Sequence, residues 1–110
     1  MNGFEWIDAR SVDEASKLLG DGAIAKAGGI DLLDLMKEGI VRPTRVINLR
    51  SIAGMDDIRI EADGTLRLGA LATLARIADD AQVLAQFGAL ASAAVHAATP
   101  QVRNVATIGG

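Results

Sequence analysis

Two adjacent glycines, Gly28 and Gly29, separate a short apolar run from a run with helical periodicity. The residues before them, 23–27, are typical of a buried strand, and the apolar residues after them recur at the spacing of a helix face. Glycine lets the backbone adopt positive φ and approach a ligand closely, and the first amides of a helix have no intrahelical acceptor. The pattern therefore favours a turn that binds an anion. It matches neither G-x-G-x-x-G nor the Walker motif, and taken alone a glycine pair before a helix is more often an ordinary tight turn.

A second glycine pair, Gly109 and Gly110, follows another apolar run near the other end of the chain. The two motifs are Ala27-Gly28-Gly29-Ile30-Asp31-Leu32 and Gln101-Val102-Arg103-Asn104-Val105-Ala106-Thr107-Ile108-Gly109-Gly110. In this order and spacing they resemble the FAD-binding subunit, or FAD domain, of the xanthine dehydrogenase family of molybdenum hydroxylases, which includes the medium subunit of carbon monoxide dehydrogenase. The resemblance extends along the whole chain, through Arg42-Pro43, Ile47-Asn48-Leu49-Arg50 and residues 68–74.

The resemblance implies an α+β fold of the FAD-binding type 2 (PCMH-type) class. It divides the chain into an N-terminal βαβ subdomain, residues 1–54, and the first part of a second α+β subdomain, residues 55–110. The implied cofactor is FAD, held through its pyrophosphate by the two glycine turns. The cofactor-binding candidates are Ala27, Gly28, Gly29, Ile30, Asp31, Leu32, Thr107, Ile108, Gly109 and Gly110.

The resemblance also implies a function. In the family, electrons pass from iron-sulfur clusters through FAD to NAD or another acceptor, so the chain would be part of an oxidoreductase. Its partners would be a molybdopterin-binding large subunit and a 2Fe-2S small subunit. FAD would carry the redox chemistry, and no residue of this chain would act as a catalytic acid, base, nucleophile or metal ligand. Family members continue beyond the second glycine pair, so the 110-residue chain alone is expected to bind FAD weakly and to be inactive.

The composition limits the classes of partner. Eleven basic and 14 acidic residues give a net charge of -3 without a block of like charge, which argues against nucleic acid or a membrane surface. The chain has no cysteine, so it holds no thiolate zinc site and no iron-sulfur cluster of its own. It shows neither a signal-like N-terminus nor a run of membrane-spanning length, and a cytoplasmic location is expected.

Local patterns predict the elements of the first half. Ser11 and Glu14 match a capping box at the start of a helix, and Gly20 stands where a left-handed residue would end it. A second helix should begin near Asp31 and end at Gly39. The strands predicted for this half are residues 4–7, 23–27 and 46–49.

The second half combines a hairpin with helices. Asp63-Gly64 lies between two alternating runs and predicts a hairpin of residues 58–61 and 65–69. Thr73 can cap a helix over 74–79, and Thr99-Pro100 should end the last helix and open a loop. The other predicted helical stretches are 81–87 and 89–98, the latter with an apolar stripe of Ala89, Leu90, Ala93, Ala94 and Ala97.

Four side chains near these motifs need separate interpretation. For Asp31, a role as N-cap and partner of the helix dipole is favoured over a ligand contact. Ile30 stands where many family members carry a polar residue, which leaves only its backbone amide for the cofactor. Arg103 is more consistent with fixing a loop than with binding phosphate. His96 lacks a second histidine or a spaced carboxylate, so a surface role is favoured over catalysis.

Two other functions stay open at this stage. One is a truncated interaction domain that keeps the fold and binds no flavin. The other is a generic nucleotide-phosphate binder, although the chain lacks the acidic residue expected about 20 positions after the glycines. A flavin absorption band in the purified protein would distinguish the first possibility from an FAD-binding protein.

Overall fold

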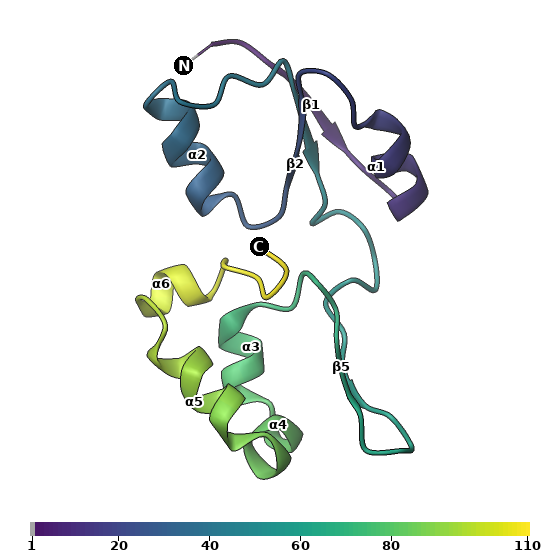
Figure 1. The fold of residues 1–110 in the computed structure, drawn as a ribbon, viewed down its shortest axis with the longest axis vertical. Helices are drawn as coiled ribbons and strands as arrows, with labels where there is room; N and C mark the ends of the chain where they lie inside the picture. The colour runs from purple at the N-terminus through teal and green to yellow at the C-terminus, as the bar shows by residue number, and fades with distance from the viewer. Residues whose placement is uncertain (1) are drawn as a thin grey trace. The chain divides into compact units, whose positions relative to one another are not determined.

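The chain divides into two units, Met1–Ala53 and Gly54–Gly110, each with its own buried residues. This computed structural model describes residues 2–110 (Figure 1).

Three parallel strands form the sheet of the first unit: β1 (Glu5–Asp8), β2 (Ala23–Lys26) and β3 (Arg45–Asn48), in the order β1-β3-β2. Helix α1 (Val12–Leu18) connects β1 to β2, and α2 (Ile30–Lys37) connects β2 to β3. The two connections cross the sheet in opposite directions. Right-handed crossovers then require α1 and α2 to lie on opposite sides of the strands, as they do in Figure 1.

The central strand β3 carries the core of this unit. Val46 and Ile47 are adjacent residues of β3, so their side chains point to opposite faces of the sheet. Both are nevertheless buried, at 2% and 0% exposed. Burial on both faces is what a parallel sheet between two helical layers requires.

The structure agrees with the predicted start of α1 but not with its predicted end. The Ser11 hydroxyl accepts a hydrogen bond from the Glu14 amide at 3.0 Å, as the capping box predicts, while the Glu14 carboxylate reaches the Arg10 amide. After the end of α1, Gly20 does not have a left-handed backbone. The left-handed residue is Gly22, with φ of 79°. Its carbonyl accepts from the Thr44 amide, so the left-handed glycine starts β2 beside β3 rather than ending α1.

The second unit begins with an antiparallel hairpin. Strands β4 (Ile58–Ile60) and β5 (Leu66–Leu68) pair around the predicted Asp63-Gly64 turn, where Gly64 has φ of 90°. Four helices follow: α3 (Leu74–Asp79), α4 (Ala81–Gln86), α5 (Gly88–His96) and α6 (Pro100–Arg103).

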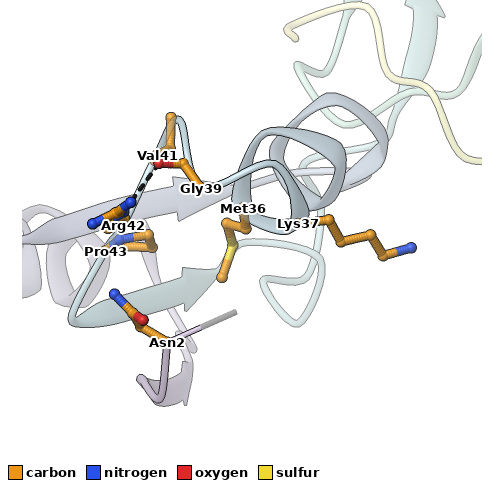
Figure 2. A pocket seen from close by; sticks show the side chains of 7 residues that line it. All are labelled: Asn2, Met36, Lys37, Gly39, Val41, Arg42 and Pro43. Atoms are coloured by element: carbon orange, nitrogen blue, oxygen red, sulfur yellow. Dashed lines mark hydrogen bonds between the residues drawn. The ribbon is translucent and has the colours of Figure 1, made fainter.

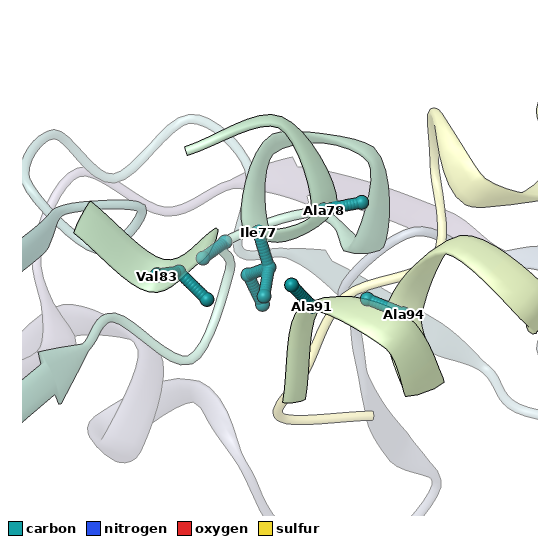
Figure 3. Packing of buried hydrophobic residues seen from close by; sticks show 6 residues of the cluster. Ile77, Ala78, Val83, Ala91 and Ala94 are labelled. Atoms are coloured by element: carbon teal, nitrogen blue, oxygen red, sulfur yellow. The ribbon is translucent and has the colours of Figure 1, made fainter. Parts of the chain in front are cut away.

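The core of this unit lies between α3, α4 and α5. Ile77 and Val83 are fully buried and pack with two small residues of α5, Ala91 and Ala94 (Figure 3). The predicted stripe on α5 is therefore partly wrong, because Ala89 and Ala93 are exposed. The pattern failed because five of the nine residues of α5 are glycine or alanine, so its sequence does not mark one face clearly.

Helix α6 corrects the prediction of a loop after Pro100. The Thr99 hydroxyl accepts from the Val102 amide at 3.3 Å, and Pro100 occupies the first helical position. Proline is favourable there because its missing amide would have had no acceptor and its fixed φ suits the first turn. Helix α5 ends at His96, two residues before the predicted end at residue 98, and Pro100 starts a new helix.

Across the part of the chain that the structure describes, no helix has the length and apolar character needed to cross a bilayer.

Candidate functional site

The first glycine turn joins β2 to α2 at the carboxyl end of the sheet. Gly29 is buried, has φ of 87° and ψ of 1°, and is the N-cap of α2. The first hydrogen bond of the helix runs from the Leu33 amide to the Gly29 carbonyl at 2.9 Å. The amides of Ile30, Asp31 and Leu32 precede this bond, so they have no acceptor within the helix.

Four of the other five helices in residues 2–110 satisfy such amides with a side chain, whereas α5, which has Phe87 as its N-cap, does not. Ser11, Thr73, Asp80 and Thr99 accept hydrogen bonds at the starts of α1, α3, α4 and α6. At α2 no side-chain cap is present among residues 2–110, because glycine has no side chain to provide one. The start of this eight-residue helix therefore presents unused amides and the positive end of its dipole to an external acceptor.

Asp31 does not cap α2, which corrects the interpretation of this residue as the N-cap. It is the second residue of the helix and is exposed, and its negative charge there interacts favourably with the positive end of the helix dipole. Ile30 and Leu32 are partly buried, so their apolar side chains anchor the turn and leave their amides as the polar groups.

A row of polar side chains crosses the sheet beside this turn. The register aligns Asp8, Asn48 and Lys26 at the carboxyl ends of the three strands. The side-chain amide of Asn48 donates to Asp8 Oδ1 at 2.9 Å, as does Trp6 Nε1, and Lys26 Nζ donates to Asn48 Oδ1 at 3.4 Å. The hydrogen bond from Asn48, and then the one from Trp6, lower the pKa of Asp8 below its ordinary value.

Lys26 lies directly against the glycine turn, and the sequence analysis did not select it. A Cβ built on Gly29 would lie 2.7 Å from Lys26 Cε, so the absence of a side chain at Gly29 leaves the space that the lysine occupies. The ammonium group is also 5.4 Å from the centre of the Trp6 ring. Partial burial, and then the charge of Arg50, lower the pKa of Lys26. The signal in the sequence was a lysine immediately before Ala27-Gly28-Gly29, at the end of an otherwise apolar run.

The second glycine turn has a different geometry. Thr107 forms an antiparallel bridge with Thr73, the Ile108 amide donates to the Ala72 carbonyl at 3.0 Å, and the Gly109 amide donates to the Ala70 carbonyl at 2.8 Å. A Cβ on Gly109 would lie 2.7 Å from that Ala70 oxygen. Glycine is needed here because two backbone segments lie in close contact, and the amides of Ile108 and Gly109 are already used.

Thr107 and Gly110 contact each other across the second turn. The Thr107 hydroxyl donates to the Gly110 carbonyl at 2.6 Å and thereby closes the turn. Gly110 has φ of 124°, a conformation that L side chains rarely adopt. The structure therefore fits a phosphate group better at the first turn than at the second.

Arg103 and His96 have structural contacts. One guanidinium nitrogen of Arg103 donates to the carbonyls of Ala97 and Ala98, both at 3.0 Å, and fixes the connection between α5 and α6. His96 Nδ1 lies 2.8 Å from the Ser92 carbonyl one turn earlier on the surface of α5. Both side chains contact backbone carbonyls of nearby residues, which is a structural role.

A shallow hollow lies at the other end of α2. Met36, Gly39, Arg42 and Pro43 are among the residues that line it, and the Arg42 side chain donates to the Gly39 carbonyl at 3.0 Å (Figure 2). It opens where α2 ends, about 12 Å along the helix from Gly29, so it is not part of the glycine turn. Within residues 2–110, no group of three or more His, Cys, Asp or Glu side chains is placed to hold a metal ion.

A parallel sheet with an uncapped helix start at its carboxyl edge is typical of domains that bind the phosphate groups of a nucleotide cofactor. The model of one family, the FAD binding domain in molybdopterin dehydrogenase, matches residues 2–110. The chain belongs to this family. The resemblance, the fold class and the FAD cofactor expected from the sequence are thereby confirmed.

Relatives agree with this assignment. The chain is 40% identical over 110 residues to the carbon monoxide dehydrogenase medium chain of Hydrogenophaga pseudoflava, covering 97% of this chain and 38% of that one. It is 35% identical over 104 residues to a putative xanthine dehydrogenase FAD-binding subunit of Escherichia coli, covering 93% and 36%. A solved structure of carbon monoxide dehydrogenase from Hydrogenophaga pseudoflava superimposes with a TM-score of 0.94 at 38% identity, over 99% of this chain and 39% of that chain. The chain thus spans little more than a third of the length of these relatives.

Proposed function

We propose that this chain is the FAD-binding portion of a molybdenum-hydroxylase-type oxidoreductase. When bound, FAD supplies the redox chemistry that takes electrons from iron-sulfur clusters and passes them to NAD or another acceptor. The partners in this proposal are a molybdopterin-binding large subunit and a 2Fe-2S small subunit, in the cytoplasm. The relatives support it, since their names describe a medium chain and an FAD-binding subunit of dehydrogenases.

The task of this chain is to bind and orient the cofactor. The observation that carries the proposal is the start of α2, where left-handed Gly29 exposes amides that no side chain of the described residues caps. The amides of Ile30, Asp31 and Leu32 would donate to the pyrophosphate, and Ala27 and Gly28 would supply the backbone that brings it close.

The second turn contributes differently in this proposal. Because the Ile108 and Gly109 amides are used within the unit, and Thr107 and Gly110 bond to each other, this turn would contribute fewer contacts with FAD than the first, through Thr107 and the backbone around Gly110. The two units would correspond to the two subdomains expected from the sequence, residues 1–54 and 55–110.

The alternative of a flavin-free interaction domain is not favoured. The match to the FAD-binding family covers residues 2–110, and the first turn keeps its free amides.

The test is an amide-resolved titration of the ¹⁵N-labelled chain with FAD, which detects weak binding as well as tight binding. We expect the largest shifts at Gly28, Gly29, Ile30, Asp31 and Leu32, and smaller ones around Thr107 and Gly110. The titration should also show weaker binding than a complete FAD subunit of a relative. Absence of any shift in the first turn at millimolar FAD would refute the proposed site.

A further inference from the structure

Lys26 provides a positive charge beside the helix start, and this charge has no carboxylate partner in the part of the chain that is described. The four ion pairs of that part involve Arg45, Arg59, Arg67 and Arg76. The hydrogen bond that the Lys26 ammonium makes is to the neutral Asn48 side chain, and at 3.4 Å it is long. Two of the three donors of the ammonium group are therefore available to another acceptor.

The position of the ammonium group is fixed close to the unused amides. Lys26 Cε lies in the space that a Cβ of Gly29 would fill, and Gly29 is the residue from which α2 begins. The ring of Trp6 limits the ammonium on one side, 5.4 Å from the ring centre, and Asn48 limits it on another. These contacts restrain the lysine side chain beside the start of α2.

The charges around this position favour an anion. Asp8 is the acidic group that acts on Lys26, but its carboxylate already accepts hydrogen bonds from Asn48 and Trp6. Burial makes the charged form of Lys26 less favourable, and the nearby positive charge of Arg50 adds to this effect. The pKa of Lys26 is therefore lowered. A bound anion would reverse this effect by supplying the missing opposite charge.

We propose that the Lys26 ammonium group binds the pyrophosphate of FAD together with the first amides of α2. This inference rests on the proposed function and adds to it a side chain that determines how tightly the phosphate part of the cofactor is held. Lysine is suited to this role because its ammonium is a compact charge that does not need the planar geometry of a guanidinium.

The experiment compares FAD binding by Lys26→Met, Lys26→Arg and Lys37→Met variants of the chain. Lys37→Met is the matched control, because it removes the same charge from the far end of α2, about 12 Å from Gly29. We expect Lys26→Met to weaken FAD binding about 10-fold or more, which is the effect of losing a hydrogen bond to a charged group. Lys26→Arg and Lys37→Met should stay within about 3-fold of the parent chain.

The urea unfolding curve of Lys26→Met separates a lost phosphate contact from a damaged fold. Unfolding should stay cooperative in Lys26→Met, and added salt should weaken FAD binding less in this variant than in the parent chain. Equal FAD affinities of Lys26→Met and the parent chain would overturn the inference and leave the proposed function intact. No binding of FAD by the parent chain would overturn the proposed function itself.

A measurement on the parent chain covers the case in which Lys26→Met does not fold. The ¹³Cε signal of Lys26 reports its protonation, and its pKa should rise when FAD binds. A purely structural role of Lys26, in contact with Trp6 and Asn48, predicts no such rise, and its absence in the FAD-saturated chain would overturn the inference.

Discussion

Replacing Gly29 with alanine tests the first glycine turn most directly. The structure gives Gly29 two separate reasons to be glycine. Its φ of 87° is left-handed, and a Cβ would lie 2.7 Å from Lys26 Cε. The first reason is a backbone cost that no neighbour can relieve, whereas the second requires the flexible lysine side chain to move.

The two costs can be summed. A left-handed alanine costs about 1–2 kcal/mol. Displacing Lys26 loses its long hydrogen bond to Asn48 and its contact with Trp6, each worth about 0.5 kcal/mol. Gly29→Ala should therefore lower the free energy of unfolding of the first unit by about 2–3 kcal/mol.

Two glycines of the same unit serve as controls. Gly39, at the other end of α2, also has a left-handed φ of 72°, but a Cβ there would meet only the end of the Arg42 side chain at 3.4 Å. Gly39→Ala should therefore cost only the backbone term, about 1–2 kcal/mol. Gly20 has neither feature, since nothing lies within 4 Å of its Cβ position and its φ is not left-handed. Gly20→Ala should be neutral or stabilising by up to about 1 kcal/mol.

The assay is urea unfolding of the three variants, followed by hydrogen exchange of the β3 amides so that the first unit is observed separately. FAD binding is titrated in parallel. The expected order of stability is Gly20→Ala, then Gly39→Ala, then Gly29→Ala, and only Gly29→Ala should weaken FAD binding by about 10-fold or more. A Gly29→Ala chain as stable as Gly39→Ala and with unchanged FAD affinity would refute the reasoning.

Three further predictions concern stability. Ile77 is fully buried, so Ile77→Ala should destabilise the second unit by about 2–5 kcal/mol in urea unfolding, whereas Leu84→Ala, at a side chain 54% exposed, should change it by less than about 0.5 kcal/mol. Ala98 has a left-handed φ of 50°, so Ala98→Gly should raise the free energy of unfolding by up to about 1 kcal/mol, and a decrease would contradict the strain. The pKa of Asp8 is lowered in the folded chain by the hydrogen bond from Asn48, so its stabilising contribution is complete above its ordinary value of 3.8 and is lost as the pH falls below it. Asp8→Asn should therefore show a shallower loss of stability between about pH 4 and pH 2, and an unchanged slope would argue against this hydrogen bond.

The sequence by itself determined the features that depend on neighbouring residues. The capping hydroxyls of Ser11 and Thr73, the Asp63-Gly64 hairpin and the termination of α2 at Gly39 follow from short-range patterns, because each depends on hydrogen bonds within about one turn of chain. The two glycine motifs, through their resemblance, also determined the family and its cofactor.

Tertiary structure decided the features that depend on residues far apart in the sequence. The left-handed glycine after α1 is Gly22 and not Gly20, because its carbonyl accepts a hydrogen bond from the amide of Thr44, the residue just before β3. The face of α5 that is buried depends on where Ile77 and Val83 lie, since an alanine-rich helix has no marked face of its own.

The two glycine turns show the same division most clearly. In sequence they look alike, with two glycines after an apolar run, and nothing local separates them. Only the fold shows that the amides of Ile108 and Gly109 donate to Ala72 and Ala70, while α2 begins without a cap. Likewise, only the alignment of β2 with β3 places Lys26 between Asn48 and Gly29. Whether a backbone amide is free depends on which distant carbonyl lies within about 3 Å of it, and that distance exists only in the folded chain.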